Sequence, residues 1–281
     1  MYWSKRWYGE WKITARRHLL IEQLSDALGS AVTLRVWGDG GNDSIYLVFD
    51  GQTPIAVARL FNPYKVGFHR IKRRRSARPN AGDNLARMDR EWQLCLHLGE
   101  QNLTPPALWR AEDVTVVGYL PGDRLPAVLR REPERWWHWM ERSVEALSRL
   151  HQEGVAHLDA KATNTIVDPS DATVRFIDLD CMPKPGHTLA QQQAFDYLKF
   201  VGSGLLLGRR AVREDAGRWA SLLDTYVPHE VRGVDVTPYL GKRALRHVVR
   251  NRPLCQALEP WFPALVRARS DSPQVVVSTR G

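Results

Sequence analysis

The sequence predicts an α+β protein with two lobes, a small antiparallel sheet in the first and mostly helices in the second. Short runs of β-branched and aromatic residues alternate with glycine- and aspartate-rich turns between residues 32 and 61. From about residue 133 onward, apolar residues recur at the spacing of helices instead. We therefore assign residues 1–121 to the first lobe and 122–281 to the second, and we expect a cleft between them.

Each element of the first lobe has its own signal. The helical spacing of the first segment ends at Gly29, and turns rich in Gly and Asp separate the three strands that follow. A basic segment containing Pro79 and Gly82 is expected to be a loop or a broken helix. The expected ranges are a helix at 11–28, strands at 32–37, 45–49 and 54–61, a helix at 84–99 and a strand at 114–120.

The second lobe is expected to be built around a long amphipathic helix at 133–151, whose tryptophans and aliphatic residues share one face. Two short apolar runs, 165–167 and 174–179, flank a turn at 168–171 and predict a pair of strands. The remaining helices are expected at 189–207, 211–226, 241–250 and 255–268.

The charge distribution indicates an anionic partner. The chain has 40 Lys and Arg against 31 Asp and Glu, a net charge of +9. Between Lys65 and Arg78 the basic residues cluster with no acidic residue among them. Such a segment attracts nucleic acid, anionic lipid headgroups or a phosphorylated glycan, or it is simply a solvated surface loop.

The first residues of the chain have a pattern that two structures would explain. Trp3, Trp7 and Trp11 recur every four residues among basic side chains, as in an amphipathic helix at a membrane surface or a helix docked on the core. No apolar run reaches the length of a membrane helix, and the three cysteines lie far apart in the sequence. We therefore expect a cytoplasmic protein.

The strongest chemical signal is the segment His157-Leu-Asp-Ala-Lys-Ala-Thr-Asn164, followed at a distance by Asp178. Phosphoryl transfer from a nucleotide needs a carboxylate that orients and deprotonates the acceptor hydroxyl, oxygen ligands for Mg²⁺, and a cation near the transferred group. Asp159 fits the first of these roles and Lys161 the last. Asn164 and Asp178 are the expected metal ligands, with Asp178 at the end of an apolar strand beside the loop.

This register resembles the protein-kinase-like superfamily, whose catalytic loop has the pattern H-x-D-x-K-x-x-N. The resemblance implies one kinase-like bilobal domain that binds ATP and Mg²⁺. Gly38, Gly40 and Gly41 would then cover the phosphates, although the full G-x-G-x-x-G is absent and a hairpin turn explains these glycines equally well. The backbone around Tyr119 would be the hinge that meets the adenine.

The resemblance also implies a phosphate-binding cation in the third strand. Arg59 occupies the position of the usual lysine, and Glu91 lies on the helix that supplies its ion-pair partner. A planar guanidinium is longer and less adaptable than an ammonium, which leaves Lys65 as an alternative phosphate contact.

Within the superfamily, the chain most resembles the lipopolysaccharide kinase (Kdo/WaaP) family over about residues 32–200. The residues that carry the resemblance are Gly67-Phe68, Arg90-Glu91-Trp92, Leu98-Gly99, Pro105-Pro106, Leu150–His157 and Phe176–Asp180. It implies phosphorylation of a sugar hydroxyl of the lipopolysaccharide inner core, or of another anionic glycolipid, by a cytoplasmic enzyme in peripheral contact with the inner membrane. No nucleic-acid partner is expected. Leu158 departs from the family, because a glycine is frequent there, and so does Ala160-Lys161.

Several alternatives stay open at this stage. A protein kinase, a small-molecule kinase or a non-catalytic nucleotide-binding pseudokinase of the same fold would share the motif, although no A-P-E segment follows it. His157 is interpreted as a structural residue that packs the loop. Asp196 either anchors the loop backbone or is a surface acid, and Asp180 either touches the metal or caps a turn.

Overall fold

The computed structural model describes residues 8–40, 43–66, 81–207 and 215–266. The chain divides into two compact units, Met1–Pro121 and Gly122–Gly281. The architecture is α+β, with strands concentrated in the first unit and helices in the second, as the sequence predicts. None of the helices in the described ranges is long and apolar enough to cross a bilayer.

The first unit contains a five-stranded antiparallel sheet with the strand order β1-β2-β3-β5-β4. The strands are β1 (Val32–Gly40), β2 (Asp43–Asp50), β3 (Thr53–Phe61), β4 (Ala107–Ala111) and β5 (Val114–Gly118). The sequence analysis missed β4. Among the described strands this edge strand pairs with β5 alone, and it lacks a clear alternation of apolar and polar residues, so local sequence gives it little signal.

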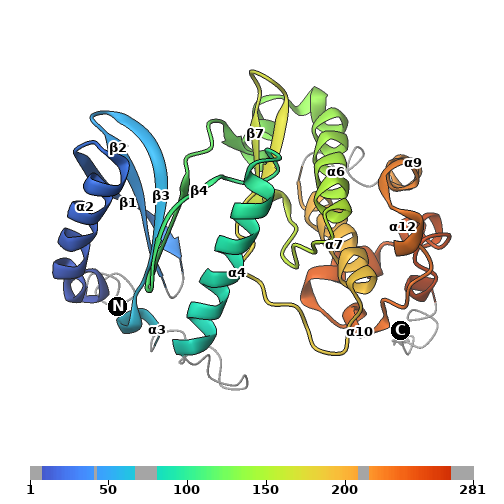
Figure 1. Cartoon of the computed structure of the whole chain (residues 1–281). Helices are drawn as coiled ribbons and strands as arrows, with labels where there is room; N and C mark the ends of the chain where they lie inside the picture. The colour runs from blue at the N-terminus through green and yellow to red at the C-terminus, as the bar shows by residue number, and fades with distance from the viewer. Residues whose placement is uncertain (1–7, 41–42, 67–80, 208–214, 267–281) are drawn as a thin grey trace, which may run out of the picture. The chain divides into compact units, whose positions relative to one another are not determined.

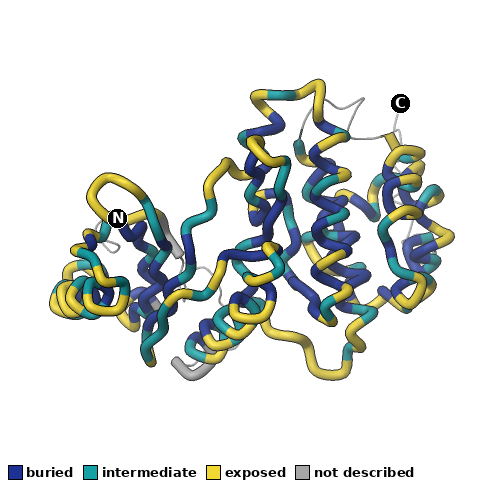
Figure 2. Tube along the Cα trace, turned by 45° about the horizontal axis from the view of Figure 1, so that its top comes forward, coloured by how far each residue is buried: buried dark blue, intermediate teal, exposed yellow. Residues whose placement is uncertain are grey.

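Helices lie on both sides of this sheet, α2 (Thr14–Leu28) on one and α4 (Ala81–Gly99) on the other, while α3 (Pro63–Val66) is a single turn (Figure 1). As predicted, α2 ends at Gly29, which adopts the left-handed conformation with φ +68°. Leu20 and Leu24 of α2 are buried against the sheet, and the outer side of the helix is exposed (Figure 2). Neighbouring strand residues point to opposite faces. The core residues Ala58 and Leu60 therefore point toward α2, and the residue between them points toward α4.

The second unit combines a small antiparallel sheet with a set of helices. The strand order is β6-β7-β8, formed by β6 (Asp123–Arg124), β7 (Thr165–Asp168) and β8 (Thr173–Phe176). The helices are α5 (Leu125–Arg131), α6 (Trp136–Gln152), α7 (Leu189–Gly204), α9 (Ala216–Tyr226), α10 (Thr237–Leu240), α11 (Arg246–Arg250) and α12 (Arg252–Ala257). The two longest, α6 and α7, lie side by side and carry most of the buried residues among these helices (Figure 1).

Two predicted ranges in this unit were wrong. The strand predicted at 174–179 ends at Phe176, so Asp178 lies beyond the strand rather than at its end. The single helix predicted at 255–268 is interrupted: α12 spans Arg252–Ala257 and helical backbone resumes only at 264, because Pro260 and Pro263 remove backbone donors and clash with the preceding turn.

Candidate active site

The loop that follows α6 has an unusual backbone. Leu158 has φ +67°, and Asp178, which comes two residues after β8, has φ +65°. Left-handed backbone is unfavourable for a residue with a Cβ atom and persists only where surrounding contacts enforce it. Both segments of the predicted motif therefore contain a residue held in a strained conformation.

Asp196 of α7 is the group that holds the loop. Its carboxylate is fully buried and accepts the backbone N–H groups of His157 at 2.6 Å and Leu158 at 2.7 Å. His151 Nε2 lies 3.3 Å from the same carboxylate. The sequence left open whether Asp196 is an anchor or a surface acid, and these contacts make it the anchor.

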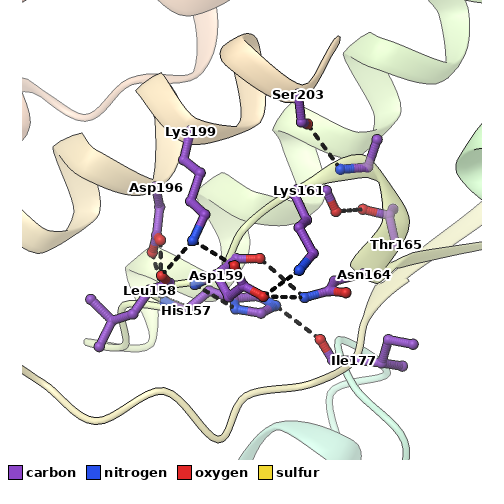
Figure 3. Close-up of polar contacts among 11 residues, drawn as sticks. His157, Leu158, Asp159, Lys161, Asn164, Thr165, Ile177, Asp196, Lys199 and Ser203 are labelled. Atoms are coloured by element: carbon purple, nitrogen blue, oxygen red, sulfur yellow. Dashed lines mark hydrogen bonds and ion pairs between the residues drawn. The ribbon is translucent and has the colours of Figure 1, made fainter. Parts of the chain in front are cut away.

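Asp159 lies at the centre of the site, and polar groups meet both of its carboxylate oxygens (Figure 3). Lys161 Nζ and Asn164 Nδ2 donate to Oδ2 at 2.6 and 2.9 Å, and Lys199 Nζ lies 2.5 Å from Oδ1. Burial by itself would raise the pKa of Asp159. The hydrogen bonds from the two lysines outweigh it and lower the pKa below its ordinary value.

The sequence analysis did not identify Lys199. Its ammonium group bridges Asp159 Oδ1 and the carbonyl oxygen of Leu158, the latter at 3.0 Å. The sequence does contain one indication of its role: Lys199 lies three residues after Asp196 in a predicted helix, and residues at this spacing share one face of a helix.

His157 connects the loop to the segment that carries Asp178. The ring is fully buried; its Nδ1 accepts the Asp159 N–H at 3.3 Å, and its Nε2 lies 3.1 Å from the carbonyl oxygen of Ile177. These partners require a neutral ring with the proton on Nε2. Burial lowers the pKa of His157 and favours the same neutral form, which fits the structural role predicted for it.

The proposed metal ligands lie on segments that are joined to each other. The Ile177 N–H donates to the Asn164 carbonyl oxygen at 3.0 Å, so the residue before Asp178 is fixed to the end of the loop. Asn164 directs its amide N–H toward Asp159, and its side-chain oxygen is the atom suited to a cation. No cluster of three or more His, Cys, Asp or Glu ligands occurs within the described ranges. Mg²⁺ does not need one, because it is commonly bound by one or two carboxylates together with phosphates and water.

In the first unit, the predicted ion pair between Arg59 and Glu91 is confirmed. Arg59 Nη1 lies 2.6 Å from Glu91 Oε2, and the two side chains are 10% and 13% exposed. Arg59 Nε also lies 3.8 Å from Asp43 Oδ2 at the start of β2. The guanidinium group is thus held between two carboxylates from different elements of this unit.

The structure contradicts the assignment of Lys65 as the alternative phosphate contact. Lys65 is buried, and its Nζ lies 2.7 Å from Glu10 Oε1 and 3.1 Å from the Asp43 carbonyl oxygen. Lys65 therefore has an acidic partner, unlike the basic segment without acidic residues to which the sequence assigned it. The other basic residues of that segment, at 70–78, lie outside the described residues.

The glycine turn and the hinge residue each differ from the prediction in one detail of the backbone. The predicted turn at 38–44 is shorter, because β1 continues to Gly40, so Gly38 and Gly40 are strand residues. Gly41 lies outside the described residues. The Tyr119 N–H already donates to the Ile55 carbonyl oxygen at 3.0 Å, so this donor is not available to an adenine. Of the two backbone groups of Tyr119, the carbonyl oxygen remains the predicted contact for an adenine.

Comparison with known proteins does not add to this description. Neither a protein-family model nor a curated protein sequence matches the chain.

Proposed function

We propose that the chain is an ATP-dependent phosphotransferase with a kinase-like bilobal fold and an alcohol group as its acceptor. The observation that carries this proposal is the geometry around Asp159. A carboxylate with depressed pKa lies between two lysines and an asparagine, on a strained loop tied to the segment of a second aspartate. Phosphoryl transfer uses groups of these kinds: a carboxylate for the acceptor hydroxyl, a cation near the transferred group and oxygen ligands for Mg²⁺.

In this proposal Asp159 receives the hydroxyl group of the acceptor. Because the two lysines keep it ionised, its main task is to accept a hydrogen bond from the acceptor hydroxyl and orient its oxygen. It would take up the hydroxyl proton as the new O–P bond forms and the bond between the γ-phosphorus and the bridging oxygen of ATP breaks, with ADP as the leaving group. Lys161 Nζ contacts the Asp159 carboxylate at Oδ2, and its positive charge can stabilise the negative charge of the phosphoryl group during transfer.

The remaining residues bind the nucleotide and its metal. Asn164 and Asp178 would hold Mg²⁺, which neutralises charge on the phosphates when it is bound. Arg59 would contact the phosphates, and Glu91 would fix the direction of its guanidinium group.

We further propose that the acceptor is an anionic glycolipid, such as a lipopolysaccharide inner-core sugar at the inner face of the inner membrane. The net charge of +9 supports an anionic acceptor or surface. Trp11 is 57% exposed, with Lys12 Nζ 4.9 Å from the centroid of its ring. Trp11 is therefore not docked on the core, which favours the membrane-surface alternative for this segment. Trp3 and Trp7 lie outside the described residues.

The test is the variant Asp159→Asn, which keeps the size of the side chain but removes its charge and leaves one acceptor oxygen in place of two. We expect phosphoryl transfer to fall by roughly 100-fold or more. Because Lys161 and Lys199 lose their anionic partner, the thermal unfolding temperature should fall as well, so activity is compared at a temperature at which both proteins are folded. Mass spectrometry of the inner-core lipopolysaccharide from cells with and without the gene identifies the acceptor. An unchanged number of phosphates on the lipopolysaccharide would contradict the proposed acceptor. Wild-type turnover by Asp159→Asn would contradict the catalytic role of Asp159.

A non-catalytic nucleotide-binding role is the second candidate, and the environment of Arg59 favours it. Two carboxylates, from Asp43 and Glu91, neutralise Arg59, the cation that the first unit is expected to place on the phosphates. Tight ATP binding by the wild-type protein without transfer to any acceptor would support this candidate over the enzyme.

A further inference from the structure

Lys199 of α7 holds Asp159 through more than one contact. Its ammonium group, which has three donors, lies 2.5 Å from Asp159 Oδ1 and 3.0 Å from the carbonyl oxygen of Leu158. A third partner is the ring of Phe195, whose centroid is 5.3 Å from Nζ. Because these partners come from the protein itself and the side chain is 16% exposed, Lys199 is placed to organise the loop rather than to bind a phosphate.

Two side chains of α7, three residues apart, hold the backbone of Leu158 at both of its polar groups. Asp196 accepts the Leu158 N–H at 2.7 Å, and Lys199 donates to the Leu158 carbonyl oxygen. Leu158 has φ +67°, a conformation that a residue with a Cβ atom keeps only where its surroundings enforce it. The direction in which the chain enters Asp159 is therefore set by α7.

The two oxygens of the Asp159 carboxylate have different surroundings (Figure 3). Oδ2 accepts from Lys161 Nζ at 2.6 Å and from Asn164 Nδ2 at 2.9 Å, which uses both of its lone pairs. Oδ1 accepts from Lys199, so within the described part of the chain it keeps one lone pair for a further donor. The Asp159 side chain is 23% exposed, which allows a hydroxyl group to reach it.

The two lysines on this carboxylate also differ in how firmly they are held. Lys161 contacts Oδ2 from a side chain that is 37% exposed, so it can turn from Asp159 toward a phosphoryl group. Lys199 is more buried, and its contacts with Leu158 and Phe195 keep it in place when Lys161 moves. Lys199 is therefore the cation that can fix the direction of the carboxylate throughout a reaction.

We propose that Lys199 is a positioning residue for the acceptor, holding the Asp159 carboxylate so that Oδ1 receives the acceptor hydroxyl group. The hydroxyl proton passes to Oδ1 as the acceptor O–P bond forms and the bond from the γ-phosphorus to the bridging oxygen of ATP breaks, with ADP as the leaving group. Lys199 keeps its contacts with Leu158 and Phe195 in this step, so the carboxylate stays aligned with the hydroxyl. The inference rests on the proposed phosphotransferase function for the existence of an acceptor, but the contact between Lys199 and Asp159 can be tested without turnover.

The contact is measured by NMR of the full chain with ¹⁵N-labelled lysines, whose ammonium signals are visible where proton exchange with water is slow. The chain has eight lysines, so the spectrum is simple, and single Lys→Arg variants assign each signal. We expect a slowly exchanging Lys199 signal that is lost in Asp159→Ala and kept in Glu141→Ala, which removes an exposed acid of α6. A Lys199 signal that Asp159→Ala leaves unchanged would overturn the proposal.

The same signals show which oxygen receives the acceptor. Delipidated inner-core lipopolysaccharide is added to protein already saturated with a non-hydrolysable ATP analogue and Mg²⁺. We expect the Lys199 signal to shift more than that of Lys161, because the hydroxyl group joins Lys199 at Oδ1. A larger shift of Lys161 would place the hydroxyl group on Oδ2 and overturn the proposal.

The kinetic test compares Lys199→Met, which loses the charge and the donors, with Lys199→Arg, which keeps the charge and can donate to two acceptors. Rates are divided by the fraction of protein that binds ATP, so that partial unfolding does not count as a lower kcat. We expect Lys199→Met to lower kcat by roughly 10- to 100-fold while the KM values of ATP and acceptor stay constant. Lys199→Arg should retain more of the kcat, and Lys242→Met, at an exposed position of the same unit, should match wild type.

Failure of this inference and failure of the proposed function give different results. Transfer by the wild type with the same kcat in Lys199→Met would overturn the positioning role and keep the phosphotransferase. An Lys199→Arg protein no more active than Lys199→Met would also overturn the positioning role. A slowly exchanging Lys199 signal in a wild-type protein that transfers phosphate to no acceptor would overturn the phosphotransferase and keep the contact of Lys199 with Asp159.

Discussion

Leu158 shows at the scale of one residue how the loop is constrained. A left-handed backbone costs a residue with a Cβ atom about 1–2 kcal/mol, yet the buried Leu158 side chain and its N–H bond to Asp196 hold φ at +67°. A glycine would relieve the backbone cost but would also lose the packing of the side chain, so a single Leu158→Gly variant cannot separate the two effects.

Comparing Leu158→Gly with Leu158→Ala isolates the backbone term, because both variants lose the packed side chain. We expect the glycine variant to be the more stable by about 1 kcal/mol in urea unfolding, since only alanine keeps the unfavourable Cβ atom. Ala146→Gly in the middle of α6 serves as the control and should destabilise by about 1 kcal/mol. A Leu158→Ala protein more stable than Leu158→Gly by as much as the control difference would show that the backbone at this position carries no strain.

At the scale of elements, α7 supports the loop with three side chains at helical spacing. Asp196 accepts two N–H groups of the loop, Lys199 contacts Asp159, and Ser203 Oγ accepts the Ala162 N–H at 3.0 Å. Positions 196, 199 and 203 lie on one face of a helix. The helix therefore fixes the position of the loop at residues 157–162.

Asp196→Asn tests this support. An amide accepts through one oxygen only, so one buried N–H of the loop loses its partner, and we expect a loss of about 2–3 kcal/mol in the free energy of unfolding. Hydrogen exchange of the His157 and Leu158 amides should accelerate. Thr225→Ala, at an exposed position of α9, is the control. Unchanged exchange at those two amides would show that Asp196 does not hold the loop.

The contact between the first described helical turn and α3 gives a pH-dependent prediction. Glu10 accepts hydrogen bonds from Lys65, Tyr46 and Ser44. Burial would raise the pKa of Glu10, but these partners lower it below the ordinary value. A carboxyl group with a lowered folded-state pKa stabilises the fold above its ordinary pKa of about 4.3, and this contribution is lost as the pH falls through the lowered value.

Glu10→Gln should therefore destabilise the protein at pH 7 by about 3 kcal/mol, because Lys65 would remain buried without an anion. The difference from wild type should shrink as the pH falls below about 4. Urea unfolding at several pH values measures it, with Glu22→Gln on the exposed side of α2 as the control. A destabilisation that does not change with pH would contradict the ionised pair.

At the scale of the whole molecule, the excess of positive charge predicts salt-dependent binding to anionic membranes. Replacement of Lys72, Arg73, Arg74 and Arg75 by serine should weaken co-sedimentation with anionic vesicles, since each cation near such a surface contributes about 1 kcal/mol. The loss should be largest at low salt, and basal ATP hydrolysis should barely change. Equal sedimentation of the variant and wild type would reduce this segment to a solvated surface.

The sequence by itself determined the features that depend on residues close together in the chain. Strands β1, β2 and β3 follow from short runs of β-branched and aromatic residues and from the turns between them, and the end of α2 follows from Gly29, whose missing Cβ atom permits the left-handed conformation. The register from His157 to Asn164 is also local, and so is the position of Glu91 on a helix. The pair between Arg59 and Glu91 was predicted only through the resemblance to a known family, which supplied the long-range contact.

Only the tertiary structure decided which distant groups meet. Lys199 reaches Asp159 because α7 packs beneath a loop that precedes it by some forty residues, and no local pattern encodes that contact. Lys65 belongs to a basic stretch in the sequence, but folding buries it against Glu10 and reverses its expected role. Asp178 was expected to end a strand, yet β8 stops at Phe176. The physical reason is the same for the two lysines: burial and charge pairing depend on which side chains are close in three dimensions, whereas the sequence gives directly only the neighbours along the chain.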